Sequence, residues 1–313
     1  PFFEKFSKQY GVEFGYTTQS PGPENYHLAK GYDAISIITT PTPAEMIDAM
    51  KENGVKVIST RTIGYDHIDL DHARSIGLRV CSASYAPNGV ADFTVMMILM
   101  CLRHYKQALW RGQVNDFSLT GLQGREMKDL TIGIIGTGRI GAQVARNLSG
   151  FGCRILAYDL RRNPAVEPQV TYVDFDTLLA QSDVITLHMP LLDSNRHIIN
   201  RESIAKMRDG VVIVNCSRGE LADIEALIEG IETGKIGALG MDTVEGDEGI
   251  IHADHRVDIL PNRNWFYLHQ FRNVIMTQHM AFYTEQAVVS MVHCGLESLV
   301  AFAENKEYRC QLQ

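Results

Sequence analysis

The sequence has no long block of lysine or arginine, no apolar run of membrane-spanning length, and no repeat or obvious flexible linker. Its 313 residues carry a formal net charge of -8, which argues against a surface for nucleic acid or for an anionic membrane. The longest apolar run, Val95 to Leu102, is far shorter than the roughly 18 residues of a membrane span. No cleavable signal opens the chain. We therefore expect a soluble protein without nucleic-acid or membrane partners.

Cysteine is also scarce and shows no spacing pattern. Its six positions are Cys81, Cys101, Cys153, Cys216, Cys294 and Cys310. Most lie inside apolar runs, which indicates buried thiols rather than a disulfide framework and predicts a cytoplasmic location. The hydrophobic fraction of 45% and the charged fraction of 21% are ordinary for a globular protein, and the length suffices for two domains.

What the sequence does contain is a series of short apolar runs that alternate with helical stretches. Because these runs are apolar throughout, they predict parallel strands covered by helices on both faces. The runs occupy residues 34–38, 55–59, 131–135, 154–158, 184–188, 211–215 and 274–277, and a further strand closes near Met241. The predicted fold class is α/β, with two doubly wound parallel-sheet domains and a cleft between them.

Three stretches of the sequence are predicted to be helical, and one of them bears on how the chain assembles. The opening residues 1–11 resemble a helix, and so do residues 285–304. After the turn at residues 86–89, the stretch from Val90 to Trp110 predicts one long helix that is apolar on nearly every side. Such a helix needs cover from another domain or subunit, so we interpret it as the interface of a homodimer. An ordinary buried core helix is the equal alternative.

A glycine motif follows one of the predicted strands directly. Gly136, Gly138 and Gly141 form G-x-G-x-x-G between an apolar strand and a helix. The first glycine permits a tight turn, the second lets a pyrophosphate approach the backbone, and the third lets helix and strand pack closely. Free N–H groups at the helix start favour phosphate. The motif alone is weak, since S-adenosylmethionine methyltransferases share it.

The residue that ends the next strand strengthens the dinucleotide interpretation. Asp159 lies 18 residues after Gly141, where a carboxylate accepts hydrogen bonds from an adenosine ribose. A turn aspartate without a ligand is the alternative. We prefer NAD, because Asp159 repels a 2′-phosphate, and Arg161 and Arg162 keep NADP as a minority option.

Three successive strand ends then supply an arginine, a carboxylate and a histidine. Arg218 follows residues 211–215, Asp242 follows the strand near Met241, and His279 follows residues 274–277. A guanidinium binds a carboxylate, and an imidazole serves as general acid or base. Taken alone, Arg218 reads as a surface arginine and His279 as a strand-end histidine. The combination predicts reduction of a 2-oxo acid, with Arg218 holding the carboxylate and His279 donating the proton.

The sequence resembles the D-2-hydroxyacid dehydrogenase family, and most closely its D-lactate dehydrogenase branch, which includes the vancomycin-resistance pyruvate reductases. The resemblance spans nearly the whole chain. It is carried by "RTIGYDHIDL" from Arg61, "YAPNGVADFT" from Tyr85, "GTGRIG" from Gly136, "VNCSRGELAD" from Val214, "MDTVEGDEG" from Met241 and "QHMAFYTEQA" from Gln278. It implies a flavodoxin-like substrate domain (residues 1–84 and 284–313) and a Rossmann NAD-binding domain (residues 85–283).

The resemblance also assigns residues to roles. Arg218 and His279 are the implied catalytic pair. The implied substrate contacts are the backbone at Ile63 and Gly64, the side chains of Tyr85, Phe282 and Tyr283, and the catalytic pair itself. The implied cofactor contacts are Gly136, Thr137, Gly138, Arg139, Ile140, Gly141, Asp159, His188, Met189, Pro190, Cys216, Ser217 and, at the nicotinamide amide, Asp242.

The chain departs from the family pattern in two places. The family's catalytic acid, five residues after the strand-end aspartate, is usually glutamate, and here that position is Asp247. We prefer Asp247 as the partner of His279, with Glu248 or Glu245 as alternatives. The second departure is the helix-like start, because relatives begin with a strand.

The expected function is NADH-dependent reduction of a 2-oxo acid to the D-2-hydroxy acid, with pyruvate to D-lactate as the leading reaction. Larger acids such as 2-oxoisocaproate or phenylpyruvate are the alternative, and a non-catalytic, NAD-sensing protein like a transcriptional corepressor is the rival from another class. We predict no metal, because His252, Asp254 and His255 lack a further ligand. Cys216 reads as a packing thiol.

Overall fold

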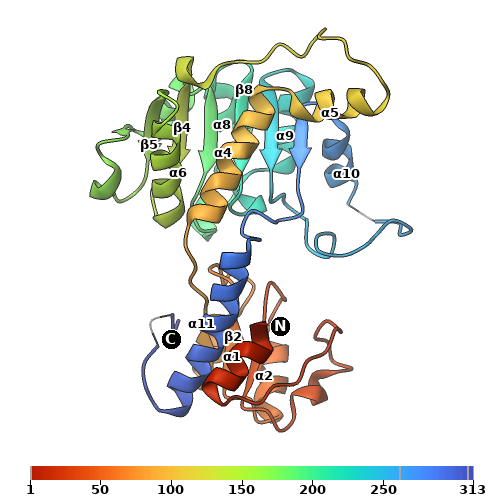
Figure 1. Ribbon diagram of the computed structural model, residues 1–313, viewed down its shortest axis with the longest axis vertical. Helices are drawn as coiled ribbons and strands as arrows, with labels where there is room; N and C mark the ends of the chain where they lie inside the picture. The colour runs from red at the N-terminus through yellow and green to blue at the C-terminus, as the bar shows by residue number, and fades with distance from the viewer. Residues whose placement is uncertain (1, 261, 309, 313) are drawn as a thin grey trace. The chain divides into compact units, whose positions relative to one another are not determined.

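The computed structural model describes residues 2–260, 262–308 and 310–312. It divides into two compact units (Figure 1). Unit 1 comprises Pro1–Ala86 and Tyr283–Gln313, and unit 2 comprises Pro87–Phe282.

Unit 2 is built on a seven-stranded parallel sheet with the order β10-β9-β8-β7-β4-β5-β6. The chain continues from β4 to β5 and β6 on one side and then returns to β7 on the other. The order therefore reverses between β4 and β7, which is where open α/β sheets bind ligands. The strands are β4 (Thr131–Ile135), β5 (Arg154–Tyr158), β6 (Thr171–Tyr172), β7 (Val184–Leu187), β8 (Val211–Asn215), β9 (Ile236–Met241) and β10 (Val274–Met276).

Helices cover both faces of this sheet (Figure 1). On one face α4 (Asn88–Leu102) and α6 (Arg139–Ser149) pack together, and α4 crosses β8 and β9. The other face carries α7 (Phe175–Gln181), α8 (Arg201–Lys206), α9 (Ile224–Glu232) and α10 (Arg263–Gln270). Short 3₁₀ turns complete the unit: η2 (Met127–Asp129), η3 (Pro164–Val166), η4 (Asp193–Asn195) and η5 (Gly219–Leu221).

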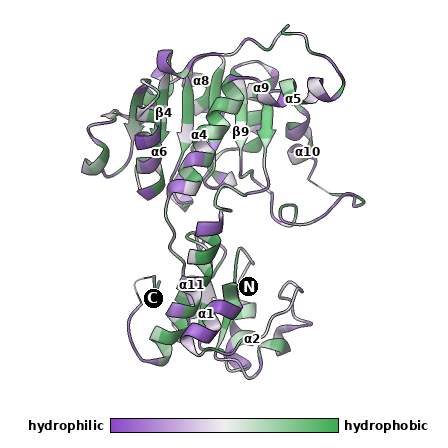
Figure 2. Cartoon of the chain, in the orientation of Figure 1, coloured by the Kyte–Doolittle hydropathy of each residue, from purple (hydrophilic) through white to green (hydrophobic). Residues whose placement is uncertain are grey.

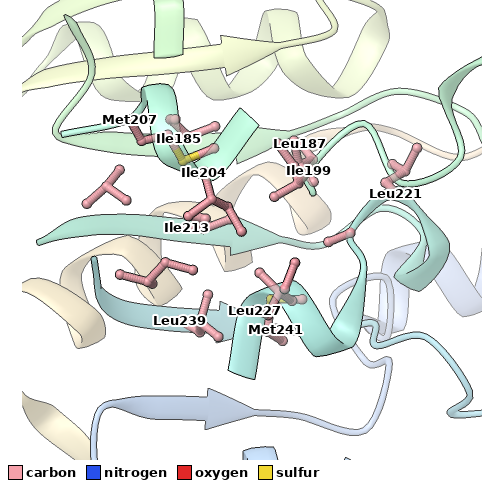
Figure 3. Packing of buried hydrophobic residues seen from close by; sticks show 14 of the residues in the cluster. Ile185, Leu187, Ile199, Ile204, Met207, Ile213, Leu221, Leu227, Leu239 and Met241 are labelled. Atoms are coloured by element: carbon pink, nitrogen blue, oxygen red, sulfur yellow. The ribbon is translucent and has the colours of Figure 1, made fainter. Parts of the chain in front are cut away.

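The core of unit 2 explains why its central strands are largely apolar. Side chains from β7, β8 and β9 interdigitate with those of α8 and α9 in Figure 3, and Leu187, Ile213 and Leu239 are fully buried. The strands are correspondingly hydrophobic in Figure 2. Each such side chain stabilises the fold by about 1.5–3 kcal/mol relative to an exposed one. The sheet is therefore a rigid base for the loops at its edge.

Unit 1 contains a three-stranded parallel sheet with the order β1 (Ala34–Ile37), β2 (Val57–Thr60) and β3 (Arg79–Cys81). Ile58 faces a cluster with α2 (Ala44–Glu52) and α3 (Leu70–Ser75), near η1 (Tyr26–Ala29). Val57 faces the opposite cluster, which includes residues of α11 (Glu285–Ala303). α11 also packs on α1 (Phe2–Tyr10). Two parallel sheets in two units confirm the predicted fold class.

α11 is also the one described helix that is long and apolar enough to cross a membrane, judged by length and composition alone. The core helix of a soluble protein meets the same criterion. Here α11 contacts β2 and α1 within unit 1.

The predicted strands correspond closely to the observed ones, but one predicted helix is wrong. Residues 90–110 do not form a single helix, because the chain breaks after α4 and resumes in α5 (Tyr105–Gln113). His104 adopts a left-handed backbone with φ 51°. Its ring hydrogen-bonds the Gln123 carbonyl at 3.1 Å. After the break, the Lys106 ammonium donates to the carbonyls of His269, Phe271 and Val274 at 2.7–3.0 Å, which fixes α5 to the end of α10 and to β10.

Candidate active site

The carboxyl ends of the parallel strands of unit 2 lie at one edge of the sheet, and most of the predicted functional residues follow them directly. A parallel sheet places ligand-binding groups at this edge, because every strand ends there. The residues that come immediately after the strands are Gly136 after β4, Asp159 after β5, His188 after β7, Cys216 after β8 and Asp242 after β9, while His279 follows β10 by three residues.

The glycine loop after β4 has a shape that only glycine permits. Gly136 adopts φ 94°, and a Cβ there would lie 2.5 Å from the His188 carbonyl oxygen. A Cβ on Gly141 would lie 1.9 Å from the Gly136 oxygen, so α6 packs against the loop without a side chain between them. Around Gly138, which precedes α6, the space is open. A pyrophosphate fits this cradle, since the first N–H groups of α6 lack helical partners.

Asp159 is tied into the glycine loop. Its Oδ2 accepts from the Thr137 N–H at 2.6 Å and from the Thr137 hydroxyl at 3.1 Å, and its Oδ1 accepts from the Arg161 N–H at 2.9 Å. Each carboxylate oxygen has two lone pairs, so Oδ1 retains a position for a ribose hydroxyl. Sequence reasoning missed Tyr172, whose hydroxyl donates to the Thr137 hydroxyl at 2.8 Å, and Asn163, whose amide donates to the Thr137 carbonyl at 2.8 Å. These contacts rigidify the loop.

His188 lies against the same loop. Its Nε2 pairs with the Thr186 hydroxyl at 3.0 Å, while its Nδ1 is buried without a hydrogen-bond partner. Burial lowers the pKa of His188 to about 3, so its ring is neutral at physiological pH. A neutral imidazole keeps positive charge away from this part of the sheet edge. His188 is therefore part of the wall beside the glycine loop rather than a proton donor.

The segment after β8 is organised by a buried asparagine that sequence reasoning did not single out. The Asn215 side chain accepts from the Ser217 N–H at 3.0 Å and donates to the Arg218 carbonyl at 2.7 Å. The Ser217 hydroxyl donates to the Met189 carbonyl at 2.6 Å, which connects this segment to the one after β7. A polar residue that ends an apolar strand was the available signal. Asn215 thereby sets the path of the backbone that carries Arg218.

Cys216 has the properties of a packing residue. Burial, and then the charge of nearby Asp242, raise the pKa of its thiol well above the usual range. The thiol also hydrogen-bonds the Thr94 side chain on α4. A thiol held protonated in this way is a poor nucleophile, in agreement with the interpretation from the sequence.

The turn that carries His279 is held by Asp242. One carboxylate oxygen of Asp242 accepts from the Thr277 hydroxyl at 2.6 Å and the Met280 N–H at 2.9 Å. The other accepts from the Ala281 N–H at 2.8 Å. His279 itself has a left-handed backbone with φ 51°, a conformation that costs free energy in residues other than glycine. The buried carboxylate thus stabilises an otherwise unfavourable turn and fixes the origin of the imidazole.

The three acidic residues after Asp242 differ in what they contact. Glu245 Oε1 accepts from Arg196 at 2.9 Å and from His197 at 2.7 Å, so this carboxylate is engaged in ion pairs. Glu248 is exposed. Asp247 Oδ2 accepts from the Val244 N–H at 3.2 Å, and burial raises the pKa of Asp247 to about 6. A raised pKa of this kind is typical of a functional carboxylate.

Most of the remaining predicted contacts belong to unit 1. The Thr62 hydroxyl donates to the Gly64 carbonyl at 2.6 Å and pairs with the Thr60 hydroxyl at 2.6 Å, which fixes the loop after β2. Tyr85 is half-buried, and Tyr283 is 68% exposed. Phe282, in unit 2, packs edge-on to His279 with ring centroids 6.3 Å apart. The predicted substrate residues therefore divide between the two units.

Among the described residues, no group of three or more histidine, cysteine or acidic side chains is arranged to hold a metal ion. His255 Nδ1 pairs with Asp258 at 2.8 Å. His252 instead points its Nε2 at the His279 carbonyl oxygen, 3.3 Å away.

The chain is similar to known proteins along most of its length. Residues 95–281 match the family model of the D-isomer specific 2-hydroxyacid dehydrogenase NAD-binding domain. An aromatic 2-oxoacid reductase of Clostridium sporogenes is 42% identical over 303 residues, which cover 96% of this chain and 92% of that protein. A D-lactate dehydrogenase of Lactobacillus delbrueckii subsp. bulgaricus is 38% identical over 311 residues, 98% of this chain and 93% of its own.

Solved structures give the same result. The pyruvate reductase of Chlamydomonas reinhardtii superposes with a TM-score of 0.88 at 36% identity, covering 97% of this chain and 95% of that one. An NAD-complexed D-isomer specific 2-hydroxyacid dehydrogenase of Lactobacillus delbrueckii ssp. bulgaricus gives a TM-score of 0.84 at 30% identity, with 100% and 96% coverage.

Proposed function

The chain belongs to the D-isomer specific 2-hydroxyacid dehydrogenase family, and we propose that it reduces pyruvate to D-lactate with NADH. The resemblance predicted from the motifs is confirmed, as is the prediction of an NAD-dependent oxidoreductase acting on 2-oxo acids. The rival interpretations, a methyltransferase and a corepressor-like binding protein, are set aside because the relatives are dehydrogenases. Substrate preference and the roles of single residues are the substance of the proposal.

In this proposal unit 2 is the NAD-binding domain and unit 1 the substrate domain. The match of residues 95–281 to an NAD-binding domain supports the first half. The cradle formed by Gly136, Gly138 and Gly141 takes the pyrophosphate, with Thr137, Arg139 and Ile140 at its rim, and Asp159 takes the ribose. The segments 188–190 and 216–217 border the cofactor further along the sheet edge. Asp242 has two carboxylate oxygens and three donors, which leaves one acceptor position for the nicotinamide amide.

Bound NADH supplies the hydride, and the chain supplies charge and the proton. Arg218 holds the substrate carboxylate and polarises the neighbouring carbonyl, as a forked guanidinium does. His279 donates the proton to the carbonyl oxygen, and Asp247 favours its protonated form. The other proposed substrate contacts are the Ile63 and Gly64 backbone with Tyr85 and Tyr283 in unit 1, and Phe282 in unit 2. The observation that carries this assignment is the clamp by which Asp242 fixes the left-handed turn at His279.

Pyruvate is the leading substrate because the similar chains include D-lactate dehydrogenases and a pyruvate reductase. A larger substrate has specific support too, since a relative 42% identical to this chain is an aromatic 2-oxoacid reductase. Phenylpyruvate and 2-oxoisocaproate are therefore the alternatives.

A substrate panel tests the proposal directly. The purified chain is mixed with NADH and, in turn, pyruvate, 2-oxobutyrate, 2-oxoisocaproate, phenylpyruvate, oxaloacetate and hydroxypyruvate, and NADH absorbance is followed; NADPH is the cofactor control. We expect the highest kcat/KM with pyruvate. A higher value with phenylpyruvate would replace pyruvate by an aromatic acid. His279→Ala should lower kcat by about 100- to 10,000-fold with the Kd for NADH unchanged, and retained turnover would overturn the role of His279.

We also propose a homodimer through α4, α5 and the segment that follows. On α4, Met96 is 41% exposed beside Val95, Leu99 and Met100 in a shallow apolar groove. Beyond it, Trp110 is 64% exposed and Leu119 83% exposed. Large exposed apolar side chains on these segments favour an interaction surface, and a second copy of the chain is the occupant that this proposal names. In sedimentation experiments we expect the wild type to be a dimer and Met96→Glu to be a monomer.

The cytoplasm is the proposed location. Cys81, Cys101, Cys153 and Cys216 are thiols outside any disulfide, which suits a reducing compartment. The net charge of -8 gives no support to nucleic-acid or membrane partners.

A further inference from the structure

The loop after β9 closes on itself. The Asn262 amide donates to the Gly246 carbonyl at 2.8 Å, so the two ends of the loop meet. Gly246 has φ 76°, and a Cβ there would lie 2.5 Å from the Asn262 amide nitrogen. Between these residues His255 pairs with Asp258 at 2.8 Å. Residues 246–260 and Asn262 therefore belong to a loop whose ends are joined, and we call it the acidic loop because it carries Asp247.

His252 connects the acidic loop to the turn that carries His279. Its Nε2 lies 3.3 Å from the His279 carbonyl oxygen. A carbonyl oxygen only accepts, so Nε2 is the donor and carries the proton. The two imidazole centroids are 6.1 Å apart, and the His252 ring meets Phe282 edge-on at 6.4 Å. His252 itself has a left-handed backbone with φ 64°, which directs its ring toward this turn at a cost in backbone energy.

The hydrogen bond of His252 completes the fixation of one peptide group. The carbonyl of His279 and the N–H of Met280 belong to the same planar unit. Asp242 accepts from that N–H at 2.9 Å, and His252 donates to that carbonyl at 3.3 Å. Both polar ends of the peptide are therefore bonded, and rotation of its plane would break one bond or the other. That plane sets ψ of His279 and thus the direction in which the imidazole leaves the backbone.

Two simpler explanations of His252 are weaker. A core-packing role does not fit, because its side chain is exposed. A metal-binding role does not fit either, since its Nε2 is directed at a carbonyl and the His255 ring is engaged with Asp258.

We propose that His252 is a positioning residue that latches the acidic loop onto the His279 turn. The latch holds Asp247 and His279 in one arrangement, so that the carboxylate and the imidazole act together. The inference rests on the proposed function, in which His279 is the general acid. It assigns His252 no contact with the substrate and no part in proton transfer.

The test uses two substitutions that differ in one property. His252→Phe keeps a ring beside Phe282 but removes the donor, whereas His252→Gln removes the ring but keeps an N–H donor. His255→Gln, on the same loop, is the matched control. Steady-state kinetics with pyruvate, or with the best acid of the panel, give kcat and KM. NADH fluorescence gives the Kd for the cofactor, and deuterium at the transferred position of NADH gives the isotope effect on kcat.

We expect His252→Phe to lower kcat by about 5- to 30-fold, because misplacement of a catalytic group slows the chemical step. KM, the Kd for NADH and the melting temperature should stay near the wild-type values, and the isotope effect should rise as chemistry becomes rate-limiting. His252→Gln should recover kcat to within about threefold of the wild type, which a packing role of the ring does not predict.

Other results would overturn the latch. Wild-type kcat in His252→Phe removes it outright. An equal loss of kcat in the Phe, Gln and control variants, or a loss that follows the melting temperature, assigns the effect to loop packing. Failure of the proposed function is recognised separately, because it requires His279→Ala to retain turnover whatever the His252 variants do.

Discussion

The turn that carries His279 and the acidic loop that carries Asp247 follow neighbouring strands, yet they are held in opposite ways. A buried carboxylate holds the turn in place. Asp242 is 1% exposed and accepts hydrogen bonds from Thr277, Met280 and Ala281 of the turn. The acidic loop is joined at its ends by the hydrogen bond from half-buried Asn262 to Gly246. The proposed proton donor, His279, is thus fixed by the core, whereas Asp247, its proposed carboxylate partner, lies on a segment with weaker restraints.

The energies of the two kinds of contact differ accordingly. Hydrogen bonds to a buried charged group contribute about 1.5–3 kcal/mol each, whereas a neutral hydrogen bond such as that from Asn262 to Gly246 contributes about 0.5–1.5 kcal/mol. This difference bears on position 247, where the family usually has glutamate and this chain has the shorter aspartate. A loop that moves at little cost can bring a shorter aspartate toward His279, whereas the turn itself cannot shift without breaking the Asp242 bonds.

Removing the carboxylate of the rigid region should have the largest effect. Asp242→Ala leaves two buried N–H groups and the Thr277 hydroxyl without their acceptor. We expect a loss of about 3–5 kcal/mol in the free energy of unfolding and at least about a 100-fold loss of kcat. Urea unfolding and steady-state kinetics measure both.

Asp242→Asn is the matched control for that experiment, because its amide keeps one acceptor oxygen. Its losses should be smaller in both measurements. If Asp242→Ala were as stable and as active as the wild type, the turn would owe its geometry to something other than the carboxylate.

Neutralising Asp247, which lies on the acidic loop, should affect activity more than stability. Asp247→Asn removes the charge that favours protonated His279, and we expect kcat/KM to fall by about 10- to 100-fold. The pKa of Asp247 is raised to about 6, so the wild-type enzyme should lose activity as the pH falls through that value. The acid limb should be absent from the pH profile of Asp247→Asn. An unchanged limb would assign it to another group.

The same substitution should change the pH dependence of stability. The folded-state pKa of Asp247 lies above its unfolded value near 3.9, so the folded protein binds the proton more tightly. Wild-type stability is therefore lost as the pH rises from about 4 through about 6. Asp247→Asn should melt at the same temperature as the wild type near pH 4 and at a higher temperature at pH 8. Equal melting temperatures at both values would contradict the buried charge.

The smallest effects should come from the other two acids. Glu245→Gln weakens the pairs with Arg196 and His197 and should cost about 0.5–1 kcal/mol, with kcat within about threefold of the wild type. Glu248→Gln removes an exposed charge and should leave kcat unchanged. A loss of activity in Glu248→Gln larger than in Asp247→Asn would reverse their assignment.

Most of the fold was predictable because the strands of both units are buried on both faces. Runs such as 131–135 and 211–215 are largely apolar, and the structure places β4 and β8 there with the same bounds. The strands that sequence reasoning missed, β3 and β6, contain only three and two residues, too few to show a period. The break at His104 was missed because a left-handed histidine leaves no compositional signal.

The sequence predicted which residues of the candidate site follow the ends of strands. Position after a strand placed Asp159, Asp242 and His279 at the sheet edge. What sequence could not show is how side chains are used. Asp242 turned out to hold a backbone turn through hydrogen bonds with residues distant in sequence. Asn215 directs the chain at Arg218 through hydrogen bonds within its own loop, whose geometry the sequence does not show.

The left-handed backbone at His279 has a consequence for how this position tolerates change. Asparagine and glycine adopt such a backbone readily, whereas β-branched residues do so only under strain. A lineage that no longer needs the reaction is therefore free to drift at residue 279 toward asparagine or glycine, but not toward valine or isoleucine. Replacement of His279 by asparagine or glycine would remove the proposed general acid but keep the turn. A descendant that has lost the activity in this way would still have the fold of the family.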